Sequence, residues 1–360
     1  MAEAQPQPAG TAKADRAASD KQAVAWVAQS SESIRTELGK VIVGQHDVVD
    51  QLLIGIFAKG HCMLEGVPGL AKTLLISTLA SATSLSFNRI QFTPDLMPSD
   101  ITGTEVIRED KTTGSRDLAF IPGPIFASVI LADEINRTPP KTQAALLEAM
   151  QERQVSTGGQ RRPLPAPFFV LATQNPIEQE GTYPLPEAQL DRFLLKITVG
   201  YPGEEDELEI IRRTTSNKAA KASPILSGED LLSIQSLVRD TPIADGVARF
   251  ALALVRATRP VELGGHKDIS SLLRWGAGPR AGQSLVLAGK ARATIRGRGF
   301  VSLDDIRAVA KPVLRHRLQP GYEAEARGML SDAIIDKLLA TVTLPAADLE
   351  QDRAVAAATA

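Results

Sequence analysis

The chain has 360 residues, of which 43% are hydrophobic and 23% charged; this balance is typical of a globular protein and excludes overall disorder. Its 40 Lys and Arg residues nearly cancel its 42 Asp and Glu residues, so a net charge of -2 gives no overall positive field for nucleic acid. A single cysteine, Cys62, excludes an internal disulfide and a cysteine-based zinc cluster.

The two ends of the chain differ in composition from the middle. Residues 1–22 are rich in Ala, Gln, Lys and Asp and lack the apolar run of a secretory signal, so we expect a disordered tail there. A second tail is expected over residues 346–360. No apolar run reaches the roughly eighteen residues that a membrane span needs. These features together predict a cytoplasmic protein.

Between residues 23 and 202, short apolar runs alternate with segments of helical periodicity. The alternation predicts an α/β domain around a mostly parallel sheet. The runs at 129–132 and 169–172 are apolar throughout, as expected for strands that helices cover on both faces. The five strands are expected at residues 61–64, 86–92, 128–132, 168–172 and 193–199.

Two segments interrupt this alternation, and both have the pattern of a hairpin. In the first, residues 104–107 and 118–121 flank a turn at 111–114. In the second, residues 154–157 and 160–164 flank a Gly-Gly pair, which is a frequent hairpin turn.

Only helical periods follow the Pro202-Gly203 pair, for example at 243–259 and 280–296. Ser302 begins a capping signature for one more helix. Because a Pro-Gly pair is a natural joint between domains, we place the boundary there. The predicted organisation is a tail over 1–22, an α/β domain over 23–202, a helical domain over 203–345 and a tail over 346–360.

A phosphate-binding loop follows the first expected strand. Its glycines let backbone amides turn toward an anion, and the helix expected from Leu74 onward adds its partial positive charge. Lys72 would reach the β and γ phosphates of a nucleotide, and the Thr73 hydroxyl would bind Mg²⁺. The general pattern has glycine before the lysine; because alanine adopts helical dihedral angles, we expect Ala71 to preserve the loop. The loop residues are Gly66, Val67, Pro68, Gly69, Leu70, Ala71, Lys72 and Thr73.

Two carboxylates end the strand expected at 128–132. In a fold of this kind the carboxyl ends of the strands face the nucleotide. Asp133 would hold Mg²⁺, directly or through water, and Glu134 would orient and deprotonate the attacking water. The two residues therefore predict an ATPase that uses ATP and Mg²⁺ rather than a passive nucleotide sensor.

The strand expected at 168–172 also ends in polar residues. Asn175 would lie between the carboxylates and the phosphates, where it would donate a hydrogen bond to the γ-phosphate or to the attacking water. The dipeptide Asn175-Pro176 is also a common turn initiator, and the residues by themselves favour that plainer interpretation.

Taken in order over residues 41–318, these elements resemble the AAA+ ATPases and, within them, the MoxR family. The loop at 66–73 is similar to the MoxR form of the Walker A motif, including Ala71, and Asp133-Glu134 is similar to Walker B. Asn175 takes the sensor 1 position. The resemblance implies that Gly44 and Gln45 lie near adenine.

The resemblance also assigns two arginines. Arg192, in the segment 184–193, matches the arginine finger, which would act in the neighbouring subunit. Arg280 matches the sensor 2 arginine on the lid, where it would report the γ-phosphate; Gly278 replaces the usual serine of that motif. The implied fold is a P-loop AAA+ core with a parallel five-stranded sheet plus a C-terminal all-α lid, with ATP at the joint between them.

The resemblance implies a homo-oligomeric ring, expected to be a hexamer, that acts as a chaperone or remodelling factor. Its clients would be partner proteins that it matures or supplies with a cofactor, together with a partner that carries a von Willebrand factor A domain. The segments 93–126 and 154–164 are similar to the helix 2 insert and the pre-sensor 1 insert. Arg161 and Arg162 would then contact the client, although ordinary solvated hairpins remain an alternative.

Three other functions stay open. The chain resembles, less closely, the ATPase subunit of magnesium chelatase. A DNA translocase or helicase has similar inserts, but the balanced charge disfavours a nucleic-acid partner. A nucleotide-gated scaffold with negligible hydrolysis is the last.

Overall fold

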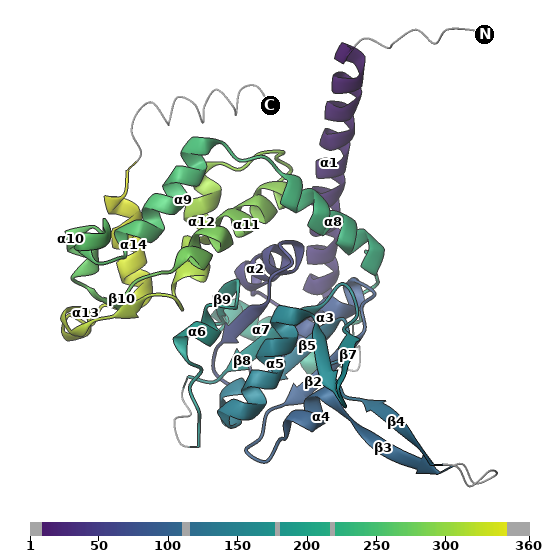
Figure 1. Cartoon of the computed structure of the whole chain (residues 1–360). Helices are drawn as coiled ribbons and strands as arrows, with labels where there is room; N and C mark the ends of the chain where they lie inside the picture. Colours follow the sequence, from purple (N-terminus) through teal and green to yellow (C-terminus); the bar gives the residue numbers. More distant parts are fainter. Residues whose placement is uncertain (1–8, 110–115, 177–180, 217–219, 344–360) are drawn as a thin grey trace, which may run out of the picture.

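The computed structural model describes residues 9–109, 116–176, 181–216 and 220–343 of the chain (Figure 1). At its centre lies a five-stranded sheet in the order β2-β5-β8-β1-β9. All neighbouring strands are parallel. The strands are β1 (Cys62–Glu65), β2 (Phe87–Gln91), β5 (Val129–Asp133), β8 (Phe169–Gln174) and β9 (Leu195–Thr198).

All five strands predicted from the sequence form, and their ends differ from the prediction by a residue or two. The parallel five-stranded α/β core is therefore confirmed. Because the strands are parallel, their carboxyl ends meet at one edge of the sheet, which is where ligands bind in open α/β folds.

Side chains on the two faces of the sheet belong to two separate hydrophobic cores. In β5, Val129 and Leu131 face one core while Ile130 and Ala132 face the other, as the alternation of side chains in a strand requires. All four are fully buried. The continuous apolar run at 129–132 thus has the cause expected from the sequence: helices cover both of its faces.

The larger core lies between the sheet and a layer of helices from both halves of the chain. The smaller core lies under α5 and the short α4. The helices of the first half are α1 (Ala9–Val41), α2 (His46–Phe57), α3 (Lys72–Ala82), α4 (Pro98–Thr102), α5 (Pro140–Glu152) and α6 (Glu187–Leu190).

One prediction for the N-terminus does not hold. Helix α1 begins at Ala9, so residues 9–22 are helical in the structure rather than part of a disordered tail. Farther along the same helix, the side chains of Val27, Ile34 and Leu38 are buried in the larger core. The apolar spacing that anchors the helix lies after residue 22, and the polar residues before it continue the same helix. The tail expected at 346–360 lies outside the described residues.

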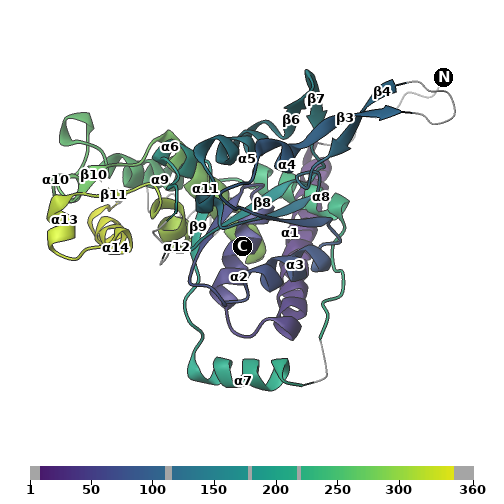
Figure 2. The same ribbon diagram turned by 90° about the horizontal axis from the view of Figure 1, so that it is seen from below.

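Both predicted hairpins are present. Strands β3 (Gly103–Glu109) and β4 (Arg116–Pro122) pair antiparallel and project from the body of the molecule in both views (Figures 1 and 2). The turn expected between them at 111–114 lies outside the described residues. Strands β6 (Gln154–Thr157) and β7 (Gln160–Pro163) pair across Gly158 and Gly159, which both have positive φ, as the Gly-Gly signal predicts.

The second half of the chain is mainly helical, as predicted, and the capping box of Ser302 with Asp305 is present. A two-stranded sheet of β10 (Leu273–Trp275) and β11 (Gln319–Pro320) is an addition that the helical periods did not indicate. The helices are α7 (Glu204–Thr214), α8 (Gly228–Asp240), α9 (Asp245–Ala257), α10 (Lys267–Ser270), α11 (Pro279–Ile295), α12 (Leu303–Leu314), α13 (Tyr322–Ala326) and α14 (Ser331–Thr341).

Helix α7 follows the predicted joint at Pro202-Gly203 and lies at the margin of the molecule in Figure 2, where Arg213 donates to the Gly39 carbonyl oxygen at the end of α1 at 2.9 Å. It has no buried residue. The division of the chain at this joint stays a prediction. Across the described parts of the chain, no helix combines the length and apolar character needed to cross a bilayer.

Candidate active site

The phosphate-binding loop connects β1 to the first turn of α3, at the carboxyl edge of the sheet. At two positions of the loop, the structure shows why the residue is glycine. A Cβ on Gly66 would lie 2.8 Å from the Val199 carbonyl oxygen, so only glycine lets the loop pass β9 this closely. Gly69 has a φ of +85°, a conformation that L side chains rarely adopt.

The structure corrects our expectation for Ala71. This residue has φ 52° and ψ 24°, which is left-handed rather than helical in the ordinary sense. The general pattern has glycine here because glycine reaches that conformation without a steric cost. The alanine therefore preserves the loop by adopting the glycine conformation, and not by extending α3 backward.

Lys72 lies across the loop. Its ammonium donates a hydrogen bond to the Gly66 carbonyl oxygen at 2.5 Å. Burial lowers the pKa of Lys72, while the negative charges of Asp133 and Glu134 act in the opposite direction. The lysine is thus close enough to both carboxylates for their charges to matter.

Asp133 is the last residue of β5, and both of its carboxylate oxygens have partners. Oδ1 accepts a hydrogen bond from the Thr173 hydroxyl at 2.6 Å. Oδ2 accepts from Nη2 of Arg89 at 2.6 Å and from its Nε at 3.0 Å. The neighbouring strands β8 and β2 therefore fix this carboxylate from both sides.

Glu134 follows directly and turns the chain with a φ of +57°. Its backbone N–H donates to the Thr173 hydroxyl at 2.8 Å, so that one buried threonine orients both acidic residues. Oε2 of Glu134 lies 2.9 Å from Nε of Arg137 and accepts from the Gln91 amide at 3.1 Å. In this conformation an arginine and an amide hold Oε2 of the carboxylate.

Asn175 comes directly after β8, between β1 and β5 in the sheet order, and its side chain is buried. It therefore lies at the same edge as the loop and the carboxylates. Sequence reasoning missed Thr173, Arg89, Arg137 and Gln91 at this edge. A signal existed for Thr173, because it follows the apolar run that ends at residue 172.

The segment expected near adenine lies beside the loop. The Gln45 side-chain amide donates to the Leu70 carbonyl oxygen at 3.2 Å. A Cβ on Gly44 would lie 2.5 Å from Oδ2 of Asp206, so the first turn of α7 lies on this segment too. The structure thus brings Gly44 and Gln45 to the phosphate loop.

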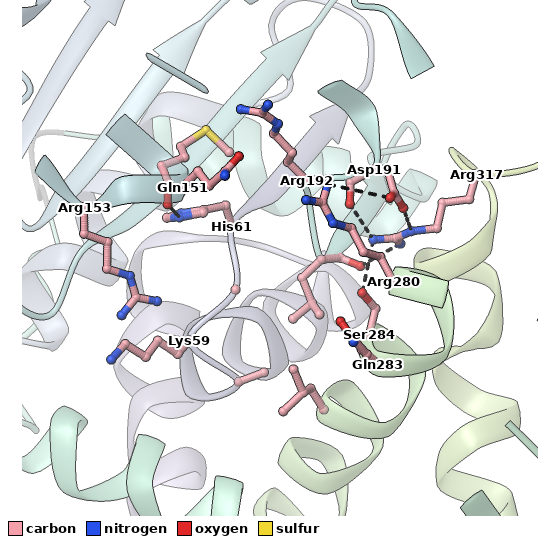
Figure 3. A pocket seen from close by; sticks show the side chains of 15 residues that line it. Lys59, His61, Gln151, Arg153, Asp191, Arg192, Arg280, Gln283, Ser284 and Arg317 are labelled. Atoms are coloured by element: carbon pink, nitrogen blue, oxygen red, sulfur yellow. Dashed lines mark hydrogen bonds and ion pairs between the residues drawn. The ribbon is translucent and has the colours of Figure 1, made fainter. Parts of the chain in front are cut away.

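The two predicted arginines lie elsewhere. Arg192 and Arg280 line a cavity of about 260 Å³ with His61 and Leu194, which precede β1 and β9 (Figure 3). This is the amino edge of the sheet. It is separated from the phosphate loop by the length of β1, about 13 Å at 3.3 Å per residue.

The contacts of these arginines are local. Nη1 of Arg192 donates to the Leu147 carbonyl oxygen at 3.1 Å, and Nη1 of Arg280 lies 3.9 Å from Oδ2 of Asp191. The expectation that Arg280 reports the γ-phosphate is therefore not met within one chain. That ATP binds at the joint between core and lid stays a prediction. The lid of this chain carries Arg280 to the edge opposite its own loop.

The donors at the carboxyl edge fit an Mg²⁺ ion that a nucleotide helps to hold. The Thr73 hydroxyl and the Asp133 carboxylate are the hard oxygen ligands that Mg²⁺ prefers, and this ion is commonly bound by one or two carboxylates plus phosphate oxygens. Within the described ranges, no three His, Cys, Asp or Glu side chains form a group able to hold a metal by themselves. Binding of the ion to Oδ2 of Asp133 requires Arg89 to withdraw.

Comparison with known proteins agrees with this geometry. Residues 61–195 match the model of the ATPase family associated with various cellular activities (AAA), and residues 266–338 match that of the AAA lid domain. The chain is 47% identical to chaperone MoxR1 of Mycobacterium tuberculosis over 86% of its own length and 81% of that relative. The chain belongs to the MoxR family of AAA+ ATPases.

Two further likenesses extend over most of the chain. MoxR of Paracoccus denitrificans is 34% identical over 86% of this chain and 95% of its own. A crystal structure from Cytophaga hutchinsonii, of a protein assigned as an ATPase, is 44% identical, with a TM-score of 0.83 over 91% of this chain and 98% of that one. The resemblance to MoxR proteins and the AAA+ core with its lid are thus both confirmed.

Proposed function

We propose that this protein hydrolyses ATP in a head-to-tail ring, and that each active site is built from two chains. One observation carries the proposal: the phosphate loop and the carboxylates lie at the carboxyl edge of the sheet, while Arg192 and Arg280 lie at the amino edge. In a head-to-tail contact, the amino edge of one copy faces the carboxyl edge of the next. Both arginines would then act on the neighbour's nucleotide.

Each group has a distinct role in this mechanism. Lys72 leaves the Gly66 carbonyl oxygen and binds the β and γ phosphates, while Gln45 and Gly44 border the base. Thr73 and Asp133 would hold Mg²⁺, which neutralises charge on the phosphates when it is bound.

Glu134 orients the attacking water and accepts its proton. Asn175 donates a hydrogen bond to that water or to the γ-phosphate. Arg192 and Arg280 of the adjacent copy stabilise negative charge in the transition state. An arginine supplied in this way is worth roughly 10³–10⁵ in rate.

The work done with this energy is proposed from the relatives. A relative is named a chaperone. We therefore propose a cytoplasmic chaperone or remodelling factor, a hexamer in its working form, that matures partner complexes together with a protein carrying a von Willebrand factor A domain. The projecting β3–β4 hairpin, with Ile107 and Leu118 paired and exposed at 70% and 71%, supports a contact with a client.

Mixed assemblies of two inactive variants test the shared site. Glu134→Gln keeps the carboxyl edge able to bind ATP but removes the base, whereas Arg192→Ala removes the finger. Each alone should lose phosphate release by a factor of roughly a hundred or more. Their mixture should regain activity, because Arg192→Ala loops can pair with intact fingers of Glu134→Gln copies. No recovery in rings shown to contain both variants would contradict the proposal.

The same assay separates the alternatives. DNA-stimulated hydrolysis with a steep salt dependence would favour a translocase. Hydrolysis stimulated by partner subunits that insert Mg²⁺ into a porphyrin would favour a role like that of magnesium chelatase. Binding of ATP by the wild-type protein without release of phosphate would favour the nucleotide-gated scaffold.

A further inference from the structure

Arg317 follows α12 on the helical part of the chain, and its side chain is almost completely buried beside the turn that carries Arg192 (Figure 3). Its Nε donates to Oδ1 of Asp191 at 2.8 Å. Its Nη2 donates to the carbonyl oxygens of Phe193 at 2.7 Å and Asp191 at 3.2 Å. A single guanidinium therefore binds the residues on both sides of Arg192.

The same guanidinium also binds the helical part of the chain. Nη2 donates to the Ser284 hydroxyl on α11 at 3.1 Å, and Nη1 donates to the Val313 carbonyl oxygen on α12 and to that of Leu194 at 3.3 Å. Nε2 of the adjacent His316 hydrogen-bonds the Phe193 carbonyl oxygen at 3.1 Å. The turn at residues 191–193 carries Arg192, and we call it the finger turn. Because a guanidinium is planar and rigid, these bonds fix the finger turn relative to α11 and α12.

Charge gives Arg317 a second effect. Asp191 is the carboxylate next to Arg192, and its Oδ1 is bound by Arg317. Its Oδ2 is only 3.9 Å from Arg280. Arg317 and Arg280 thus share this carboxylate, with Arg317 the closer of the two. Without Arg317, the full charge of Asp191 would be available to Arg192 and Arg280. Pairing with either of them would reduce the positive charge offered to a neighbour.

We propose that Arg317 is a positioning residue for the arginine finger: it ties the Arg192 turn to α11 and α12, and by binding Oδ1 of Asp191 it competes with Arg192 and Arg280 for that carboxylate. The inference rests on the proposed function, since Arg192 has this role only in a shared active site. It also predicts that movement of the helical part displaces the finger, because the two are bound to one side chain.

Two variants test the inference. Arg317→Ala removes every hydrogen bond of the guanidinium. Arg317→Lys keeps the positive charge but lacks the planar set of N–H donors. In assembled protein, both should lower kcat at least tenfold, because a displacement of about 1 Å at an active site can cost roughly a hundredfold. The Kd for ATP should stay near that of the wild type, since the phosphate loop lies at the other edge. Wild-type kcat in Arg317→Lys, measured as phosphate release, would overturn the proposal.

Complementation distinguishes a misplaced finger from a damaged fold. In an equal mixture of Arg317→Ala and Glu134→Gln copies, the intact fingers of the second should serve the loops of the first. Activity should then rise to roughly a quarter of the wild-type rate, the share of head-to-tail contacts with the competent combination. No recovery would overturn the proposal, provided that Arg192→Ala is rescued under the same conditions. Failure of the Arg192→Ala rescue would instead contradict the shared site itself.

Arg315→Ala is the matched control. Arg315 also joins the helical part to the sheet, through the Lys196 carbonyl oxygen at 3.1 Å and the Thr198 hydroxyl at 2.8 Å on β9. It makes no bond to the finger turn, so its loss should leave kcat within about twofold of the wild type. A loss of kcat equal to that of Arg317→Ala would show that any contact between the two parts suffices, and the specific role of Arg317 would be rejected.

Discussion

His61 precedes β1 and is buried at the amino edge of the sheet. The Val170 backbone N–H donates to Nδ1 at 3.0 Å, so the ring proton is on Nε2 and is donated to the Met150 carbonyl oxygen at 3.1 Å. Burial lowers the pKa of His61 from 6.5 to about 4, and the positive charge of Arg153 acts in the same direction. The native ring is therefore neutral well below neutral pH.

This gives a pH-dependent contribution to stability. Between pH 6.5 and pH 4 the unfolded chain binds a proton at His61 that the native state does not, so stability is complete above pH 6.5 and is lost as the pH falls. The loss is about 3 kcal/mol. Urea unfolding at pH 7 and pH 4.5 should show a smaller pH dependence for His61→Gln than for the wild type. The exposed His46→Gln is the control, and an equal slope in all three proteins would refute the prediction.

At the scale of single residues, the sequence located the phosphate loop and the two carboxylates but not their hydrogen-bond partners. Lys72, Asp133 and Glu134 could be predicted because loop, strand and carboxylates are contiguous in the chain. Arg89, which binds Asp133, comes from β2 and is far away in sequence. The conformation of Ala71 was also misjudged, because a propensity says nothing about the path that the loop must follow.

Among the elements, the two hairpins meet around the side chain of Arg162. Arg162 on β7 lies over the Phe120 ring, 3.9 Å from its centroid, and its Nη2 is 3.4 Å from Oε1 of Glu105 on β3. These contacts partly bury Arg162, whereas Arg161 beside it is exposed. The contact of both arginines with a client stays a prediction. Isolated two-stranded hairpins are marginally stable, so this contact supports both.

Arg162→Ala should therefore loosen the hairpins without unfolding the core. A cation–π pair at a partly exposed site is worth about 0.5–1 kcal/mol, so amide hydrogen exchange in β3, β4, β6 and β7 should accelerate roughly two- to fivefold. Exchange in the central sheet should be unchanged. Arg161→Ala is the matched control and should leave hairpin exchange as it is. Equal protection in Arg162→Ala and the wild type would contradict this account.

Helices and strands were predicted correctly where a sequence pattern has a single structural explanation. The central strands β1, β5 and β8 were found because both of their faces are buried, whereas the edge strands β2 and β9 are partly exposed. Residues 9–22 were wrongly expected to be disordered, since their composition hides the fact that an anchored helix continues through them. The pairing of β10 with β11 was missed because strands of two or three residues leave no periodicity.

For the whole molecule, the separation of loop and arginines predicts that a single chain hydrolyses ATP poorly. Phosphate release per chain, measured with Mg²⁺ and saturating ATP, should rise with protein concentration and reach a plateau as rings form. The mass in solution, from light scattering, should rise over the same range. Arg192→Ala should assemble but stay slow at every concentration. A constant rate per chain in a protein that remains monomeric would exclude the shared site.

By itself, the sequence determined the α/β core, the helical second half and which residues gather at the carboxyl edge, because each depends on residues that are near one another in the chain. Only the tertiary structure decided where Arg192 and Arg280 lie relative to the phosphate loop. Their places follow from how the helical part packs on the sheet, through long-range contacts such as those of Arg317 with Asp191 and Phe193. A motif specifies which groups are present, whereas packing specifies which edge of the sheet they reach.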